Sequence, residues 1–171
     1  MYDVTVDFPK MKVAVIVRDG RVVEIRYVPL TAPSVEPRDP IAEKAKEQLE
    51  RYREDPDATF DLPIHVEGTE LQKRVWQAMR AIPRGKTRTY GELASELGEI
   101  ARELGVEPRG LNRAVGQACG DNKLPIVIPC HRVVAANGIG GFAHSSDGYL
   151  IEAKRWLLNH EIRPEEFELK G

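Results

Sequence analysis

The chain has 171 residues, of which 42% are apolar and 30% are charged, and its formal net charge is −2. This composition excludes a disordered or fibrous protein, and the length predicts one domain or two small ones with packed cores. No apolar run approaches the roughly 18 residues of a membrane span, and the acidic start Met1-Tyr2-Asp3 does not fit a secretory signal. We therefore expect a cytoplasmic protein without membrane attachment.

The beginning of the chain predicts a small antiparallel sheet. Apolar and polar residues alternate over residues 2–8, as they do in a half-buried strand. Two β-rich runs, 11–17 and 21–28, flank Asp19-Gly20, a dipeptide that tolerates the positive φ angles of a tight hairpin turn. An antiparallel arrangement of these strands is the expected result.

A helix and a further strand are predicted after this sheet. Asp39 can cap a helix that has Pro40 at its first position, and apolar residues then recur at helical spacing. Residues 60–66 alternate again between apolar and polar side chains, which predicts another strand. Together these elements predict an α+β domain over residues 1–67.

The second half is predicted to be mainly helical. Thr69 with Gln72, and Thr89 with Glu92, fit the capping box that begins a helix. Gly98 lies inside the second apolar stripe and is expected to interrupt that helix. The stripes that follow the two caps are Leu71, Val75, Met79 and Ile82, and then Leu93, Leu97, Ile100 and Leu104.

A shorter basic helix is predicted over residues 109–119. A helix, a turn and a short basic helix are typical of the helix-turn-helix of DNA-reading proteins, and a plain helical bundle is the other interpretation of the pattern. The apolar segment 124–135, which contains two prolines, is expected to be extended. A final helix is expected over residues 148–160.

Charge is distributed unevenly along the chain. Residues 1–67 carry 10 basic and 14 acidic side chains, residues 68–135 carry 11 and 7, and residues 136–171 carry 4 and 6. Since salt screens the attraction to phosphate beyond about 10 Å, the basic middle can bind nucleic acid although the net charge is negative. Chance surface composition is the alternative explanation of this difference.

The two cysteines, Cys119 and Cys130, are too few for a disulfide framework or a four-cysteine metal site. A thiolate is a strong nucleophile, and Cys130 is followed directly by His131, a candidate base. Adjacent side chains on a strand point to opposite faces, so the pair can cooperate only across a turn or through a water. The carboxylate that orients the histidine could be Glu152 or Glu161. A buried structural cysteine is the other interpretation.

Residues 128–134, Ile-Pro-Cys-His-Arg-Val-Val, resemble the active-site signature of the O6-alkylguanine-DNA alkyltransferases, the methylated-DNA–protein-cysteine methyltransferases. The resemblance covers about residues 69–163, with the motifs in the family's order. The other segments that carry it are Val75-Trp76, Ile82-Pro83-Arg84-Gly85-Lys86-Thr87, Thr89-Tyr90-Gly91-Glu92-Leu93-Ala94, Arg113-Ala114-Val115-Gly116, Asn122, and Lys154-Arg155-Trp156-Leu157-Leu158 with Glu161.

The resemblance implies an alkyl transfer without metal or organic cofactor. Cys130 would take the alkyl group of O6-alkylguanine, and of O4-alkylthymine, in double-stranded DNA. His131 would act through a water as the base, oriented by Glu161. Asn122 would join the recognition helix to the active-site segment, and Tyr90 would help extrude the lesion and donate a hydrogen bond to guanine N3. The thioether product is inert to water, so one molecule should work once.

The resemblance also implies the DNA contacts. Arg113 would enter the base stack in place of the flipped base, and the small residues Ala114 and Gly116 would allow close approach to the minor groove. The other expected DNA contacts are Thr89, Tyr90, Gly91 and Ala136. The expected base pocket contains Cys119, Val133, Phe142, Ala143 and Ser145. We expect a monomer that associates with the nucleoid when it is bound to DNA.

The fold implied by the resemblance is α+β. Residues 1–67 would form a ribonuclease H-like domain with a small antiparallel sheet and a helix, and residues 68–171 a mainly helical DNA-binding and alkyltransferase domain with a helix-turn-helix. The chain departs from the family pattern in about a dozen extra residues near 98–110, and in Phe142 where a tyrosine is usual.

Two other functions compete with the alkyltransferase. A non-catalytic protein that binds alkyl lesions through its helix-turn-helix would not need Cys130. A cysteine hydrolase using Cys130 and His131 would turn over, and it would not need Arg113 or the basic middle of the chain.

Overall fold

The computed structural model describes residues 1–138 and 149–162. The chain begins with a three-stranded antiparallel sheet in the order β1-β2-β3, which confirms the predicted sheet. Asp19 and Gly20 have φ angles of 51° and 75°, the left-handed conformation that a tight hairpin between β2 and β3 requires. The strands are β1 (Val4–Asp7), β2 (Lys12–Arg18) and β3 (Arg21–Val28).

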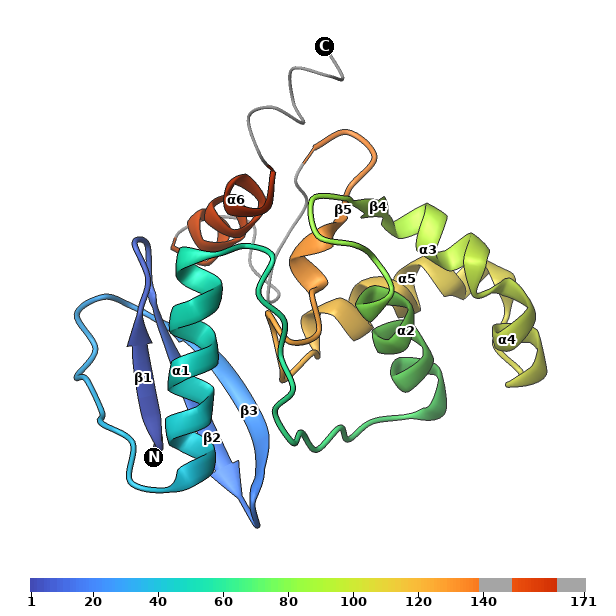
Figure 1. The fold of residues 1–171 in the computed structure, drawn as a ribbon. Helices are drawn as coiled ribbons and strands as arrows, with labels where there is room; N and C mark the ends of the chain where they lie inside the picture. Colours follow the sequence, from blue (N-terminus) through green and yellow to red (C-terminus); the bar gives the residue numbers. More distant parts are fainter. Residues whose placement is uncertain (139–148, 163–171) are drawn as a thin grey trace.

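Helix α1 (Pro40–Glu54) covers one face of this sheet (Figure 1). The Asp39 carboxylate accepts a hydrogen bond from the Ala42 backbone N–H at 2.8 Å, and Pro40 occupies the first turn, as predicted. The cap fixes where the helix begins and therefore which side chains face inward. Those buried side chains are Ala42, Ala45, Gln48, Leu49 and Tyr52.

The prediction of a strand over residues 60–66 is wrong. The segment makes a single parallel bridge, between Ile64 and Val22. The Val22 N–H donates to the Pro63 carbonyl, and the Val22 carbonyl accepts a hydrogen bond from the His65 N–H. Pro63 has no N–H to continue a ladder, so the alternating side chains only line the edge of the sheet. The segment then leads across to the helical part of the molecule (Figure 1).

The second part contains helices α2 (Glu70–Arg80), α3 (Tyr90–Glu96), α4 (Gly98–Glu103), α5 (Pro108–Gly120) and α6 (Tyr149–Glu161). Both predicted capping boxes are present, at Thr69 and at Thr89. The predicted break is also present, because α3 ends at Glu96, with Leu97 as its C-cap, and α4 begins at Gly98. The extra residues of this region thus form a short helix, and α2, α3 and α4 all contact α5.

The segment predicted to be extended over residues 124–135 is extended only near its end, at 133–134, and the part before it is not. The Asn122 side chain accepts a hydrogen bond from the Leu124 N–H and donates one to the Ile128 carbonyl, both at 2.9 Å, and this curls the chain back. Cys130–Arg132 then form a turn of 3-10 helix, η1. The short strand β5 (Val133–Val134) follows and pairs in parallel with β4 (Arg88–Thr89).

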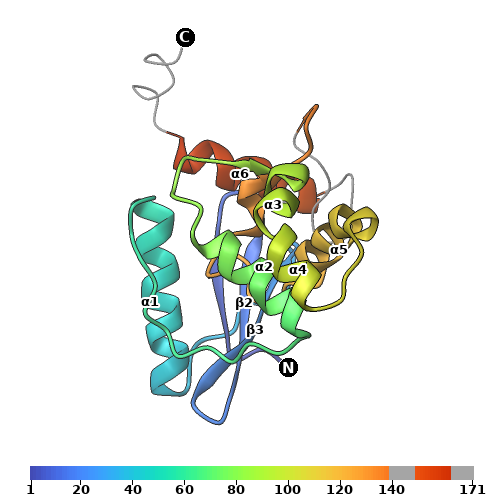
Figure 2. The same ribbon diagram turned by 90° about the vertical axis from the view of Figure 1, so that its right-hand side faces the viewer.

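The sheet and the helices share one continuous apolar core. In the side view, α6 lies across the top of the molecule between α1 and the other helices (Figure 2). It contacts both parts, since Trp156 packs edge-on against Phe8, with 5.4 Å between ring centroids, while the Lys154 ammonium donates to the Val133 carbonyl. Among the described helices, none is long and apolar enough to cross a membrane.

Candidate active site

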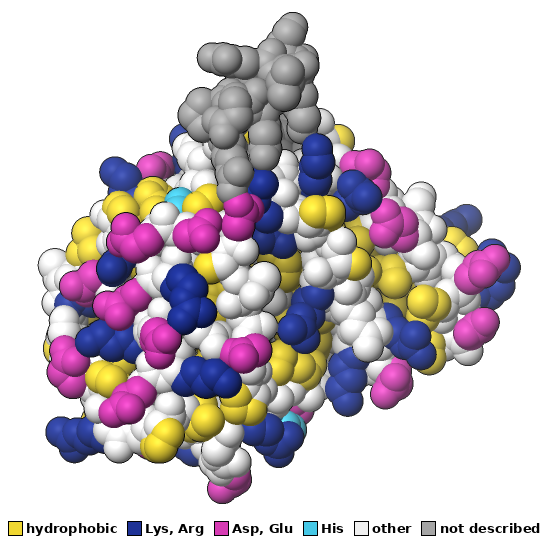
Figure 3. Space-filling model, in the orientation of Figure 1, with side chains coloured by type: hydrophobic (Ala, Val, Ile, Leu, Met, Phe, Trp, Pro, Cys, Tyr) yellow, Lys and Arg dark blue, Asp and Glu magenta, His cyan; other side chains and the backbone are white. Residues whose placement is uncertain are grey.

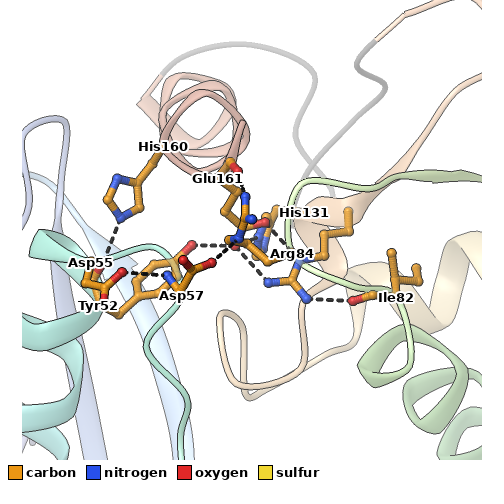
Figure 4. A network of polar contacts seen from close by, with 9 residues as sticks. Tyr52, Asp55, Asp57, Ile82, Arg84, His131, His160 and Glu161 are labelled. Atoms are coloured by element: carbon orange, nitrogen blue, oxygen red, sulfur yellow. Dashed lines mark hydrogen bonds and ion pairs between the residues drawn. The ribbon is translucent and has the colours of Figure 1, made fainter. Parts of the chain in front are cut away.

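Cys130 opens the 3-10 turn η1, and its side chain is only 6% exposed. His131 is fully buried, and its Nε2 lies 2.8 Å from Oε2 of Glu161 (Figure 4). Glu161 is the last residue of α6, whereas the other candidate carboxylate, Glu152, is exposed. The structure thus brings Glu161, and not Glu152, to the histidine.

Glu161 is the centre of a buried polar network. Arg132 donates from Nε to Oε1 at 2.8 Å and from Nη2 to Oε2 at 3.0 Å, a bidentate pair. The Tyr52 hydroxyl donates to Oε2 at 2.6 Å, and Arg84 holds the Glu161 backbone carbonyl. Burial by itself would raise the pKa of this carboxyl, but the hydrogen bonds from His131 and Arg132 and the charge of Arg132 outweigh it and hold the pKa well below its usual range. Glu161 is therefore ionised.

His131 is poised as a neutral base. Burial lowers its pKa and outweighs the opposite effect of Glu161, so the ring is neutral at neutral pH. Because an ionised carboxylate can only accept, Nε2 carries the proton and Nδ1 carries the lone pair. Nδ1 is buried and has no hydrogen-bond partner among the described residues. The ring nitrogen that can take a proton is therefore the one that Glu161 leaves unused.

Cys130 is a thiol at rest. Burial raises its pKa, while the hydrogen bond with Asn122 and the positive charge of Lys154 lower it to a smaller extent. Lys154 is itself fully buried, and burial lowers its pKa to about 8. A thiol in this setting becomes a nucleophile when a base removes its proton during attack, and the neutral His131 is beside it in the same turn.

The pairing of β4 with β5 explains how Tyr90 reaches the site. Thr89 lies opposite Val134, so the first residue of α3 stands beside the segment that follows Cys130. Burial raises the pKa of Tyr90 to about 12, and the two cysteines contribute in the same direction. Its phenol is therefore a hydrogen-bond donor at neutral pH. The half-buried Cys119, on α5, shares these surroundings, and burial raises its pKa.

The predicted base pocket is only partly within the described residues. Val133 is buried directly after η1, and Cys119 is half-buried. Phe142, Ala143 and Ser145 lie outside the described residues.

The predicted DNA contacts lie on exposed or half-buried positions. Arg113 is exposed on α5, and Ala114 and Gly116 are half-buried on the same helix. Thr89 and Gly91 are at the N-terminus of α3, and Ala136 is exposed beyond β5. Acidic and basic side chains are mixed over the face drawn in Figure 3. The charge pattern of that face therefore does not indicate a binding surface for DNA or another charged partner.

Three further residues join the site that the sequence analysis did not select, namely Tyr52, Arg84 and Arg132. Arg132 directly follows His131 and could have been noticed for that reason. Tyr52 belongs to the apolar face of α1, and Arg84 to a turn, so neither pattern indicated a polar role. The described residues contain no group of metal-ligating side chains that could hold an ion.

The chain is similar to known proteins of one family. Residues 70–163 match the family model of the 6-O-methylguanine DNA methyltransferase DNA-binding domain. The methylated-DNA–protein-cysteine methyltransferases of Methanosarcina acetivorans and Bacillus subtilis are 44% and 41% identical over 119 residues. Each match covers 69% of this chain, and 67% and 64% of the respective relative.

Solved structures extend the likeness over nearly the whole chain. The Mycobacterium tuberculosis O6-methylguanine methyltransferase is similar with a TM-score of 0.70 and 31% identity, over 98% of this chain and 97% of that one. The M. tuberculosis OGT in complex with DNA gives a TM-score of 0.70 and 32% identity, over 98% of each chain. The arrangement of a buried cysteine, histidine and glutamate, the family model and these relatives together show that the chain belongs to the methylated-DNA–protein-cysteine methyltransferase family.

Proposed function

We propose that this protein repairs alkylated DNA directly, by moving the alkyl group of O6-alkylguanine in duplex DNA to Cys130. The observation that carries the proposal is the orientation of His131, the residue that follows Cys130: its Nε2 is held by Glu161, and its buried Nδ1 has no hydrogen-bond partner among the described residues. Family membership supports the substrate class. O4-alkylthymine is a second substrate on the same reasoning, because its oxygen carries the same kind of alkyl group.

The reaction balances without a metal or an organic cofactor. The Cys130 proton passes through a water to Nδ1 of His131, and the sulfur attacks the alkyl carbon. The bond between that carbon and O6 breaks, and its electron pair stays with the guanine. Hydrogen bonding from Tyr90 to the ring meets the charge that develops there. The guanine then takes up one proton, which balances the proton that His131 received from the thiol, and the base is restored in the DNA. The new thioether does not hydrolyse, so each protein reacts once.

Docking of DNA is assigned to a helix-turn-helix formed by α3 and α5, with α5 as the recognition helix. Gly116 supports this face, because a Cβ built at that position meets no atom of the described chain within 4 Å. The absence of a side chain at Gly116 leaves this face of α5 open to close approach of the minor groove of DNA, as the proposal requires.

Arg113→Ala is expected to weaken repair of a duplex roughly 10- to 100-fold, because the guanidinium replaces the stacking of the extruded base. Reaction with free O6-methylguanine should change less than about twofold, since no base has to be extruded. Single-turnover rates on both substrates measure this, with the exposed Arg109→Ala of the same helix as the matched control. Equal losses on the two substrates would remove Arg113 from the base stack.

The remaining features of the proposal concern organisation. Residues 1–67 form a ribonuclease H-like domain and residues 68–171 the DNA-binding and alkyltransferase domain. The protein works as a monomer in the cytoplasm and is associated with the nucleoid when it is bound to DNA.

The decisive experiment is mass measurement after incubation with excess duplex DNA containing one O6-methylguanine. The expected result is a gain of one methyl group on the Cys130 peptide that saturates at one per protein. An unmodified protein that still binds this DNA would instead be a non-catalytic lesion-binding protein. Repeated turnover of an acyl substrate, without stable modification, would identify a cysteine hydrolase.

A further inference from the structure

The N-terminal part of the chain contributes a hydrogen bond to the active-site carboxylate. Tyr52 is in the last turn of α1, and its side chain is 2% exposed. Its hydroxyl donates to Oε2 of Glu161 at 2.6 Å, across 109 positions of sequence (Figure 4). The carboxylate that orients His131 is therefore held from both parts of the molecule.

Tyr52 and His131 share one acceptor atom. Oε2 of Glu161 receives the Tyr52 hydroxyl at 2.6 Å, the His131 ring at 2.8 Å and Nη2 of Arg132 at 3.0 Å, while Oε1 receives Nε of Arg132 at 2.8 Å. Donors on the same oxygen each withdraw electron density from it, so each weakens the bond that the other can make. The phenol thus reduces the strength with which Glu161 attracts a proton on His131.

The Tyr52 ring is fixed in this position. It packs against Phe60 with 5.7 Å between ring centroids, and against the edge of His160 at 5.2 Å. His160 also forms a hydrogen bond with the Tyr52 backbone carbonyl at 2.6 Å. Burial, reinforced by the charge of Glu161, raises the pKa of Tyr52 far above its usual value, so the hydroxyl keeps its proton and stays a donor.

We propose that Tyr52 is a positioning residue of the transfer reaction, which fixes the Glu161 carboxylate and tunes its hold on the His131 proton. The proposal rests on the proposed function for its kinetic consequence. It makes the N-terminal part a component of the reactive site in addition to any part it plays in folding.

The sign of the effect on pH dependence follows from this geometry. Only neutral His131 can accept the thiol proton, so the transfer rate falls as the pH drops through the pKa of His131. Removal of the Tyr52 hydroxyl leaves more negative charge on Oε2, which favours the protonated ring and raises that pKa. The ionisable groups that act on the ring are Glu161 and Lys154 on α6 and Arg132 on η1. Tyr52 on α1 and Tyr27 on β3 act on Glu161, and Cys130 precedes the ring in η1.

Tyr52→Phe is therefore expected to move the acid limb of the rate profile to higher pH, and to lower the rate at its plateau by about three- to tenfold, the usual effect of one buried hydrogen bond. Single-turnover transfer from O6-methylguanine duplex between pH 5 and 8 measures both. The matched control is Phe60→Leu, which disturbs the packing of the same ring but keeps the hydroxyl, and its acid limb should not move.

A second readout does not depend on DNA. The titration of the His131 ring, followed by NMR, should shift to higher pH in Tyr52→Phe and stay in place in Phe60→Leu. A slower rate with unmoved limb and titration in both variants would reduce Tyr52 to a structural role and overturn the proposal. Absence of methyl transfer by the wild-type protein would refute the proposed function, while the titration would still decide whether Tyr52 tunes His131.

Discussion

Cys130→Ala protein should transfer no methyl group to itself and should still bind duplex DNA that contains O6-methylguanine. The sulfur atom is the acceptor in the proposed reaction, and alanine has no atom that can form the new bond. DNA affinity should stay within about threefold of the wild type, because Cys130 is 6% exposed and the DNA contacts are assigned to other, exposed residues of α3 and α5. Intact-protein mass and equilibrium DNA binding measure the two properties.

Folding of the Cys130→Ala variant is the necessary control. The side chain is small, so its truncation should cost about 1 kcal/mol of unfolding free energy, the usual effect of a lost buried methyl-sized group. Thermal unfolding of variant and wild type checks this. Methyl transfer that persists in the folded variant, for example on the Cys119 peptide, would place the nucleophile elsewhere and contradict the proposed mechanism.

Glu161→Gln should slow methyl transfer by about 100-fold or more, within the range that acid–base groups contribute to catalysis. An amide can donate as well as accept, so it no longer selects the tautomer that leaves the Nδ1 lone pair for the thiol proton. The loss of negative charge also disfavours the protonated ring, which lowers the pKa of His131 further. The acid limb should move to lower pH, opposite to its direction in Tyr52→Phe.

The Glu161→Gln protein also loses the buried charge that faces Arg132, so its stability has to be measured separately. Removal of one partner from a buried ion pair typically costs about 3 to 5 kcal/mol. His131→Asn is the companion variant, because it removes the base and leaves the Arg132–Glu161 pair intact. Both variants should bind lesion DNA like the wild type. A wild-type transfer rate in folded Glu161→Gln would exclude Glu161 from the relay.

The local elements were predictable because their signals lie within a few residues of one another. Asp39 caps α1, Thr69 and Thr89 form capping boxes, and Asp19-Gly20 makes the hairpin. The prediction of a strand at 60–66 was wrong although apolar and polar side chains do alternate there. Pro63 has no N–H to donate to the hydrogen-bond ladder of a sheet, and the segment makes a single bridge. The prediction of an extended segment before Cys130 was wrong for a similar reason. The Asn122 side chain bonds the Leu124 N–H and the Ile128 carbonyl, which in an extended chain would bond to a partner strand.

The sequence by itself determined which reactive side chains the site contains, because residue types can be read directly from it. The Cys-His-Arg run resembles the active-site signature of one family. Only the tertiary structure decided how these groups meet. It placed Glu161, the carboxylate that the resemblance implied, and not Glu152, against Nε2 of His131, and it brought Tyr52 from α1 onto the same oxygen. Such contacts join residues 30 and 109 positions apart, so they depend on how α6 packs between the sheet and the helices, which no local pattern specifies.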